Sequence, residues 1–444
     1  MRVAIIGAGY VGLVSGACLA ARGHDVACVD VDSRRVDLIN SGVPPIHERD
    51  LPELLRAHVG RNLRATTDIV AAVAGAELSF IAVGTPTADG RTDLGFVTQA
   101  AGQIGEVLRV APDWRTVVVK STVIPGTTAG LVREAMEAAS GQIAGKGFGL
   151  GMNPEFLTEG TAVHDFMHPD RLVLGGFDPQ TQQALLALYQ DFPAHIPRVV
   201  TNTTTAEMIK YASNALLATM ISFSNEFARL CSAVGDVDAL DVMKGVHQSA
   251  YLTTTLSDTR ITAPIAGFIE AGCGFGGSCL PKDVQALVGQ GETLGLPMPL
   301  LRSVLDVNAG QADEILRLAS KHFLNLTGVA VTVLGIAFKP DTGDVRESPA
   351  FPIIARLRAA GARITAFDPI ARPVDHPGLT SVRLASTLEE AVEDTDVIVV
   401  TTRWAEFTAL PALLKGLAKP PLVVDGRRML RSQDLARYEG IGRA

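Results

Sequence analysis

The chain has 444 residues, more than the roughly 250–300 at which a single hydrophobic core stops growing, so we expect two or three domains. Its composition, 47% hydrophobic and 19% charged, is typical of a soluble globular protein. The net charge of −8 argues against a general binder of nucleic acids or of acidic membranes, so anionic ligands must meet local basic groups or backbone amides.

The five cysteines contain no repeated C-x-x-C pair, which favours a reducing compartment over a disulfide framework. The uncharged run 3–21 contains four glycines and no convincing cleavage region, so we interpret it as part of the fold and not as a signal peptide. No other apolar run of the sequence is long enough to span a bilayer. We therefore expect a cytoplasmic protein.

The first residues have the order of a dinucleotide-binding unit. A buried parallel strand is predicted over 3–6, a glycine-rich turn over 7–12, and an apolar helix from there to Ala21. A second strand over 26–29 ends at Asp30. A lone G-x-G-x-x-G is weak evidence, but strand, glycines, helix, strand and acid in this order predict dinucleotide binding.

The residue types in this unit favour NAD. Gly7 and Gly9 permit a tight turn that lets a pyrophosphate lie at the helix N-terminus, and Gly12 lets helix and strand pack closely. Asp30 would accept hydrogen bonds from the adenine ribose and repel a 2′-phosphate. The arginine pair at 34–35 keeps NADP open as the alternative, because a nearby arginine can accommodate that phosphate.

Three further strands are predicted over 78–83, 116–120 and 148–152. Each runs into a polar segment: Thr85 follows the first, Ser121 and Thr122 follow the second, and the loop 153–160 with its two carboxylates follows the third. In open α/β sheets ligands bind beyond the carboxyl ends of the strands, so these segments are placed to contact the cofactor. Ordinary turn and helix-capping chemistry is the alternative interpretation.

His164 and His168 have the spacing of a zinc-binding pair on a helix. The sequence has no H-E-x-x-H pattern there, and no third ligand stands out nearby. Surface histidines are the simpler interpretation, and we assign no metal.

A long helix is predicted from Thr204 to about Val234. Lys210 and Asn214 are four residues apart and therefore share one helix face. Their neighbours are apolar, so a lysine there is costly unless it meets a partner; a lysine whose ammonium reaches solvent at the helix edge is the alternative. The helical region continues to about Gly310 and would form a dimer surface between two α/β units.

The glycine-rich segment 274–283 interrupts this helical region. Its glycines allow close approach to a ligand or a positive φ. Pro281 can begin a helix, which would place Cys279 at a helix N-terminus, where partial positive charge lowers the pKa of a thiol. Asp283, one turn on, could take or orient a proton. The pattern indicates a positioned nucleophile, with a buried free cysteine as the alternative.

A second α/β unit is predicted from strands over 329–335, 363–368, 396–400 and 422–425. Lys339, Arg346 and Arg427 fall beyond the ends of its strands and could converge on phosphates, or could be scattered surface charges. The predicted fold is α/β, with two Rossmann-like doubly wound units joined by a central helical region with a long helix. The expected domains are 1–200, 201–312 and 313–444.

Taken together, these motifs resemble the UDP-glucose/GDP-mannose dehydrogenase family over nearly the whole chain. The resemblance rests on the turn 7–12, V-G-T-P-T at 83–87, S-T-V-x-P-G-T at 121–127, N-P-E-F-L-x-E-G at 153–160, K-x-x-x-N at 210–214, G-F-G-G-S-C-x-P-K-D at 274–283 and F-K-P-D-T-G-D-x-R-E-S-P at 338–349. It implies that the first unit binds NAD, that the second binds the nucleotide of a nucleotide sugar, and that the central helix forms a homodimer.

The resemblance also implies a reaction, the oxidation of a sugar C6 alcohol to a carboxylate in two hydride transfers that consume two NAD⁺. Cys279 would form a thiohemiacetal with the aldehyde and then a thioester that water cleaves. Lys210 and Asn214 would stabilise oxyanions at the reacting carbon. Glu155 would act as the base for thioester hydrolysis, while Thr122 and Asp283 would hold the water and tune protons.

Further contacts are implied by the same motifs. The NAD contacts would be Gly7, Gly9, Tyr10, Val11, Gly12, Asp30, Arg35, Thr85, Ser121, Thr122, Glu159, Lys282 and Arg346. The nucleotide-sugar contacts would be Glu155, Phe156, Leu157, Glu159, Lys210, Asn214, Arg260, Phe268, Gly274, Phe338, Lys339 and Arg427.

Some positions depart from the family pattern. Leu280 replaces the usual aromatic residue after the cysteine, as in the GDP-mannose branch, whereas His-Pro-Asp-Arg at 168–171 is similar to the UDP-glucose branch. The family's P-I-Y-E-P-G-L appears as P-I-H-E-R-D-L at 45–51. Arg260 is expected to match the family's arginine that reaches a neighbouring subunit's substrate, but the spacing from Arg260 to Gly274 is longer than in the family pattern.

We favour UDP-glucose as the substrate, with GDP-mannose or a UDP-N-acetylhexosamine as alternatives. A β-hydroxyacid-type dehydrogenase, which makes a single hydride transfer and needs no thiol, is disfavoured by Cys279 and by the second α/β unit. A non-catalytic NAD-binding regulator is the remaining alternative.

Overall fold

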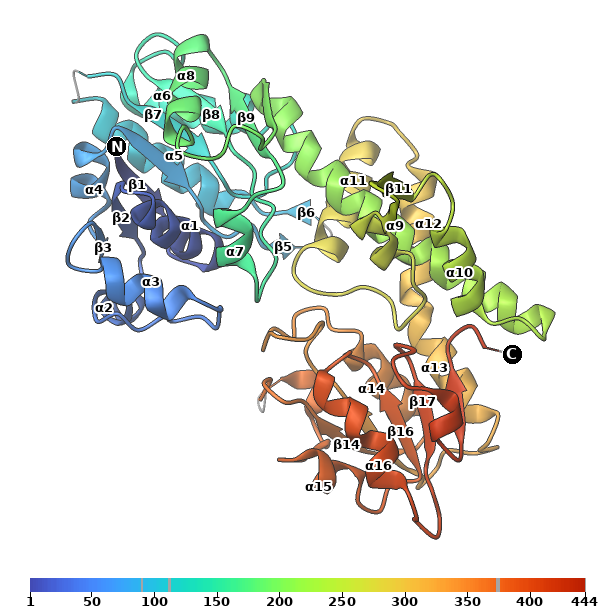
Figure 1. Ribbon diagram of the computed structural model, residues 1–444. Helices are drawn as coiled ribbons and strands as arrows, with labels where there is room; N and C mark the ends of the chain where they lie inside the picture. The colour runs from blue at the N-terminus through green and yellow to red at the C-terminus, as the bar shows by residue number, and fades with distance from the viewer. Residues whose placement is uncertain (89–90, 111–112, 373–375, 444) are drawn as a thin grey trace. The chain divides into compact units, whose positions relative to one another are not determined.

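The computed structural model describes residues 1–88, 91–110, 113–372 and 376–443, shown as a ribbon in Figure 1. The chain divides into two compact units, Met1–Ser213 and Asn214–Ala444. In the described ranges, no helix is long and apolar enough to cross a membrane. The predicted division at residues 200 and 312 stays a prediction.

The first unit is built on a Rossmann-like sheet of eight described strands, in the order β10-β9-β8-β7-β4-β1-β2-β3. Their bounds are β1 Arg2–Ile6, β2 Asp25–Val29, β3 Leu63–Thr66, β4 Leu78–Ile81, β7 Thr116–Val119, β8 Gly149–Met152, β9 Leu172–Gly176 and β10 Arg198–Thr201. All neighbouring pairs are parallel except β8 and β9. The strand order reverses between β1 and β4, which is the point where α/β sheets of this type bind ligands.

Helices cover this sheet: α1 Tyr10–Ala21, α2 Ser33–Asn40, α3 Leu51–His58, α4 Ile69–Gly75, α5 Gly95–Leu108, α6 Arg133–Ser140, α7 Ala162–Met167 and α8 Pro179–Leu188, with a π-helical turn Thr128–Val132 before α6 and a small hairpin of β5 Thr87–Ala88 and β6 Arg91–Thr92.

The glycine turn has the predicted geometry. Gly7 has a φ of 103°, and a Cβ on Gly12 would overlap the carbonyl oxygen of Gly7. Only glycine at position 12 therefore lets α1 begin directly against β1.

The long central helix, α9, runs from Thr203 to Val234 and passes from the first unit into the second. Its first turns are fixed to the first unit by Glu207, which is fully buried. The carboxylate of Glu207 accepts hydrogen bonds from the amides of Gly126 (2.6 Å) and Thr128 (2.8 Å). The predicted long helix is confirmed. Through Glu207 its first turns are hydrogen-bonded to the segment that follows β7.

The second unit contains a parallel sheet of six described strands, in the order β15-β14-β13-β16-β17-β18. Their bounds are β13 Ala330–Leu334, β14 Arg363–Phe367, β15 Arg383–Leu384, β16 Val397–Val400, β17 Leu422–Asp425 and β18 Tyr438–Gly440. The helices are α10 Ala239–His247, α11 Leu280–Thr293, α12 Pro299–Ala309, α13 Gln311–Ser320, α14 Ala350–Ala359, α15 Leu388–Val392 and α16 Leu410–Leu414, with single 3-10 turns at Pro264–Phe268, Pro377–Leu379, Ala405–Ala409 and Ser432–Asp434. One hydrophobic cluster joins this sheet to Ala228 of α9 and to Cys273.

An antiparallel hairpin was not predicted from the sequence. It pairs β11 (Thr253–Leu256) with β12 (Thr259–Thr262), in the region whose spacing departs from the family pattern. Arg260 lies on the second, exposed strand of this hairpin, and most of the 260–274 segment follows the hairpin and includes the 3-10 turn Pro264–Phe268.

Candidate active site

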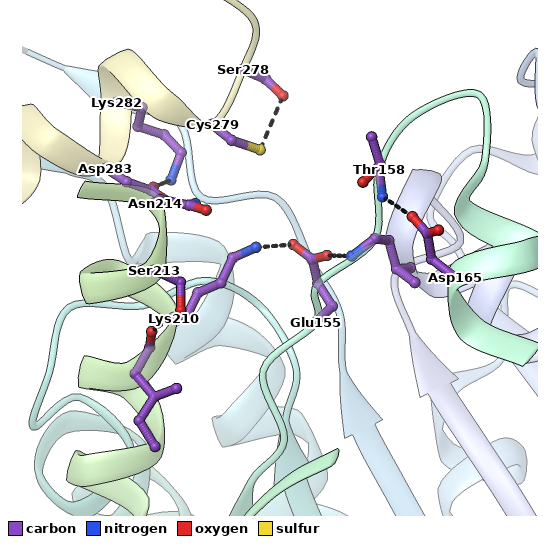
Figure 2. A network of polar contacts seen from close by, with 12 residues as sticks. Glu155, Thr158, Asp165, Lys210, Ser213, Asn214, Ser278, Cys279, Lys282 and Asp283 are labelled. Carbon is purple, nitrogen blue, oxygen red and sulfur yellow. Dashed lines mark hydrogen bonds and ion pairs between the residues drawn. The ribbon is translucent and has the colours of Figure 1, made fainter. Parts of the chain in front are cut away.

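Two opposite charges are buried together where β8 ends in the first unit. Lys210 Nζ lies 3.0 Å from Glu155 Oε1, and the two side chains are 6% and 8% exposed. Figure 2 shows the ammonium of Lys210 directed at this carboxylate. The partner that the sequence required for a lysine on an apolar helix face is Glu155, and the alternative of a solvent-reaching lysine is wrong.

The charge state of Glu155 is set by opposing influences. Burial favours its neutral form, but the positive charge of Lys210, a hydrogen bond from the Leu157 amide (2.6 Å) and the charge of Lys120 outweigh burial. The pKa of Glu155 is consequently below its ordinary value. At neutral pH the site therefore holds a carboxylate, which is the form that a general base requires.

The ring of Phe156 lies close to two cations. The guanidinium of Arg171 lies 3.9 Å from the ring centroid, and Lys210 Nζ lies 5.5 Å from it. Arg171 also donates to Ser213 Oγ at 3.1 Å. Cation–π contacts of this kind restrict the ring, so the 153–160 loop is attached to α9 at several points.

One helical turn beyond Lys210, Asn214 takes part in a buried network in the second unit. Its side-chain amide donates to Asp283 Oδ2 at 2.6 Å, and Lys282 Nζ lies 2.5 Å from Asp283 Oδ1. Asp283 is fully buried. These contacts, drawn in Figure 2, attach the first turn of α11 to α9.

Cys279 is the N-cap residue of α11, as predicted from Pro281. Its side chain is exposed, with Sγ 3.6 Å from Ser278 Oγ. The alternative of a buried free cysteine is therefore wrong for Cys279, although it holds for the other four cysteines. An exposed thiol at a helix N-terminus has the environment in which a thiolate is favoured.

Gly274 and Gly277 have the positive φ that was expected as one of two roles of these glycines, and the segment also packs inside the second unit. A Cβ on Gly277 would lie 2.7 Å from the Phe338 ring, and this glycine has a φ of 82°. A Cβ on Gly276 would overlap the carbonyl oxygen of Glu347. The glycine-rich segment that contains Cys279 (274–283, the cysteine loop) thus packs against the 338–349 segment, and Gly276 and Gly277 permit that contact.

The end of β2 carries the acid expected beside the adenosine of NAD. Asp30 accepts hydrogen bonds from the amides of Ala8 and Asp32, both at 3.0 Å, and Arg35 Nη1 lies 2.9 Å from its Oδ2. Arg35 therefore already has an anionic partner within the protein. The turn at Gly7, the N-terminus of α1 and Asp30 suit a dinucleotide with a free ribose 2′-hydroxyl.

Sequence reasoning missed Glu48, a carboxylate that is 3% exposed. It accepts hydrogen bonds from the Tyr10 hydroxyl, from Gly160 N (2.7 Å) and from Ala162 N (2.9 Å). Burial and the bond to Glu48 raise the pKa of Tyr10. Glu48 matches the acid of the family's P-I-Y-E-P-G-L pattern although neighbouring positions of the 45–51 segment differ. This match is the signal that could have identified Glu48 from the sequence.

The remaining predicted residues lie as follows. Thr85, Ser121, Thr122 and Glu159 follow strands of the first unit; Ser121 Oγ donates to Val83 O at 2.7 Å. In the second unit Arg346 contacts Asp344, Lys339 lies 5.8 Å from the Phe338 ring, and Arg260 donates to Thr253 and Gln248. Phe268 ends a 3-10 turn and is 38% exposed.

Arg427 ties the second sheet to the cysteine loop. Its guanidinium donates to Thr401 O at 2.6 Å and to Gly274 O at 3.1 Å. Arg427 and Gly274, both predicted substrate contacts, are thus brought together. The convergence of Lys339, Arg346 and Arg427 on phosphates stays a prediction.

Within the described residues, no cluster of three or more His, Cys, Asp or Glu could hold a metal ion. The rings of His164 and His168 do approach each other, with centroids 4.9 Å apart.

Comparison with known proteins covers nearly the whole chain. Three models of the UDP-glucose/GDP-mannose dehydrogenase family match: the NAD binding domain over residues 1–193, the central domain over 204–310 and the UDP binding domain over 332–432. A UDP-glucose 6-dehydrogenase of Haloferax volcanii is 40% identical over 448 residues, covering 99% of this chain and 100% of the relative. A GDP-mannose 6-dehydrogenase of Pseudomonas savastanoi is 38% identical, covering 92% and 93%.

Solved structures agree with this assignment of the fold. The UDP-glucose dehydrogenase of Pyrobaculum islandicum superposes with a TM-score of 0.89 at 37% identity, covering 100% of this chain and 98% of that one. A UDP-D-ManNAc dehydrogenase of Pyrococcus horikoshii gives a TM-score of 0.85 at 27% identity, covering 100% and 99%.

Proposed function

Because the chain belongs to the UDP-glucose/GDP-mannose dehydrogenase family and is an NAD-dependent nucleotide-sugar 6-dehydrogenase, we propose that its substrate is UDP-glucose and its product UDP-glucuronate. The choice of UDP-glucose is supported by the similarity to UDP-glucose 6-dehydrogenases over nearly the entire chain. The identity to GDP-mannose 6-dehydrogenases is almost as high, so GDP-mannose is the principal competitor.

The proposed reaction proceeds through a covalent bond to Cys279. The C6 alcohol loses a hydride and a proton and becomes an aldehyde, to which the Cys279 thiolate adds. The resulting thiohemiacetal loses a second hydride and proton and becomes a thioester. Water then attacks the thioester carbon, the thiolate leaves, and the carboxylate is released. NAD accepts the hydrides when it is bound; the exposed sulfur at the N-cap of α11 supports the role of the cysteine.

Five further residues would support this chemistry. Lys210 and Asn214 would donate to the oxygen on C6 as it gains negative charge. Glu155 would take a proton from the hydrolytic water, since its pKa is held low and it is ionised at neutral pH. Asp283 would orient Asn214 through the 2.6 Å bond to its amide, and Thr122 would hold the water.

A homodimer is proposed through one face of α9. Leu216, Phe223, Phe227 and Leu230 recur at helical spacing and are 39–56% exposed, and the Phe223 and Phe227 rings lie 4.6 Å apart. An apolar stripe of this length indicates burial against a partner. Replacing Phe223 and Phe227 by glutamate should give monomers in light scattering, whereas L324E, which changes an exposed leucine of the same unit, should leave the dimer intact. A wild-type monomer would contradict the proposal.

We also propose a cytoplasmic location, because Cys18, Cys28, Cys231 and Cys273 are buried thiols outside any disulfide, as is usual in a reducing compartment.

The test of the proposed function is a count of NADH formed per sugar consumed. UDP-glucose, GDP-mannose and UDP-N-acetylhexosamines are supplied separately in limiting amounts with excess NAD⁺. We expect two NADH per UDP-glucose and the highest kcat/KM for that sugar. A single NADH per sugar would exclude the four-electron reaction, and a higher kcat/KM for another sugar would replace the proposed substrate.

A further inference from the structure

Lys120 is a buried cation that neither the sequence motifs nor the proposed mechanism uses. It follows β7 directly and is 4% exposed. Its ammonium donates to Asn153 Oδ1 at 2.9 Å, and the buried Tyr189 hydroxyl donates to the same oxygen at 2.6 Å. Since Asn153 is a neutral amide, this contact does not neutralise the ammonium. Keeping a charge in such a place is costly and calls for a reason.

The surroundings of Lys120 make its charge effective over a distance. The ammonium lies 5.4 Å from the centre of the Phe80 ring and 5.9 Å from that of Phe166. It lines a cavity of about 270 Å³ that Glu155 also lines. Charges separated by protein instead of water interact more strongly. Glu155 is thus influenced by two cations, Lys210 in direct contact and Lys120 on the wall of the same cavity.

This arrangement answers a difficulty in the proposed chemistry. Lys210 pairs with Glu155 at 3.0 Å, yet it must donate to the substrate oxygen during the reaction. A buried carboxylate that loses its partner takes up a proton, and a protonated Glu155 could not act as a base. We propose that Lys120 is a positioning residue that keeps Glu155 ionised while Lys210 engages the substrate. The inference rests on the proposed function and deepens the account of the same site.

The titration of Lys120 fits this role. Burial lowers its pKa to about 8, so the ammonium remains charged throughout the acid range in which Glu155 would take up a proton. Its charge is also among the influences that lower the pKa of Glu155. Besides Tyr189, the other titratable or charged groups lining the cavity are His164, Asp165, His168, Asp170 and Arg171. They are common to wild type and variants, so a difference between the pH profiles reports on Lys120.

The experiment compares the pH dependence of kcat in wild type and K120M, which removes the charge and keeps the length of the side chain. Activity falls in acid as Glu155 becomes protonated. Without Lys120 the pKa of Glu155 rises, so the acid limb should move to higher pH by roughly one unit, with activity recovering above it. K146M, which removes an exposed lysine of the same unit, should retain the wild-type profile. NAD affinity and thermal melting establish that each variant is folded.

Two further variants separate charge from structure. Y189F removes the second donor to Asn153 and keeps the ammonium, so its acid limb should stay at the wild-type pH. In the E155Q background, K120M should cost little additional turnover, because Lys120 acts through Glu155. If K120M does not fold, K120Q, which retains a donor for Asn153, carries the same comparison.

An unshifted acid limb in a folded K120M, or an equal shift in Y189F, would overturn the proposal. Failure of the proposed function is distinguishable, because the wild-type enzyme would then release fewer than two NADH per sugar whatever the behaviour of K120M.

Discussion

C279A should abolish net oxidation, with kcat lower by roughly 10⁴-fold or more, while NAD affinity stays within about twofold of wild type. The thiol is proposed to hold the aldehyde and to make the second hydride transfer possible, so its loss removes a bond-forming step. Because the thiol is proposed to react with the sugar and is not among the expected NAD contacts, its loss should leave NAD affinity nearly unchanged. Steady-state NADH formation and NAD titration measure the two quantities.

The matched control for this variant is S278A. Ser278 Oγ lies 3.6 Å from Cys279 Sγ and belongs to the same loop, so S278A tests whether any change in this loop destroys activity. We expect its kcat to stay within about threefold of wild type, because weak contacts to sulfur contribute little. Turnover of C279A at the wild-type rate would contradict the assignment of Cys279 as the nucleophile.

K210M should lower kcat by roughly 10²–10³-fold and change the KM for the nucleotide sugar much less. A donor to the developing oxyanion acts chiefly in the transition state, so its removal affects kcat more than ground-state binding. The variant should also be less stable by about 3–5 kcal/mol, because it leaves Glu155 buried without its 3.0 Å partner. Thermal melting and steady-state kinetics report these effects separately.

The double variant K210M/E155Q distinguishes catalysis from stability. Neutralising Glu155 as well removes the unpaired charge, so stability should return most of the way to wild type. Turnover should not return, since the oxyanion donor and the base are both absent. A loss confined to KM in K210M would contradict the oxyanion role.

Local sequence patterns were sufficient to predict much of the fold. The apolar runs at 3–6, 26–29 and 422–425 are strands in the structure, because continuous burial in a parallel sheet leaves a direct mark on sequence. The long helix and the helix entrance at Cys279 followed from periodicity and from Pro281 for the same reason. Each of these features depends on residues close together in the chain.

What could not be predicted depends on residues far apart. Glu48 receives hydrogen bonds from Gly160 and Ala162, more than a hundred positions away, and Glu207 accepts from the loop at Gly126. Lone acids of this kind have no periodicity that distinguishes them from surface residues. The antiparallel pairing of β8 with β9 was missed because strand direction is a property of the assembled sheet.

The sequence offered two roles for the glycines of the 274–283 segment, close approach to a ligand or a positive φ, and left their packing partner open. Their sequence pattern shows that something approaches the backbone closely, and does not show whether it is a ligand or the protein itself. In the structure it is Phe338 at Gly277 and the Glu347 carbonyl at Gly276. The identity of the partner required the fold of the second unit.

The central claim is that the sugar carbon becomes covalently bound to Cys279. In E155Q hydrolysis of the thioester should be slow, so the bound acyl group should accumulate when this variant is mixed with UDP-glucose and NAD⁺ and quenched in acid. Peptide mass mapping should then find the added mass of the oxidised nucleotide sugar on the peptide containing Cys279, at close to one per active site. Release of NADH by E155Q with that peptide unmodified, or with the added mass on another residue, would contradict the account.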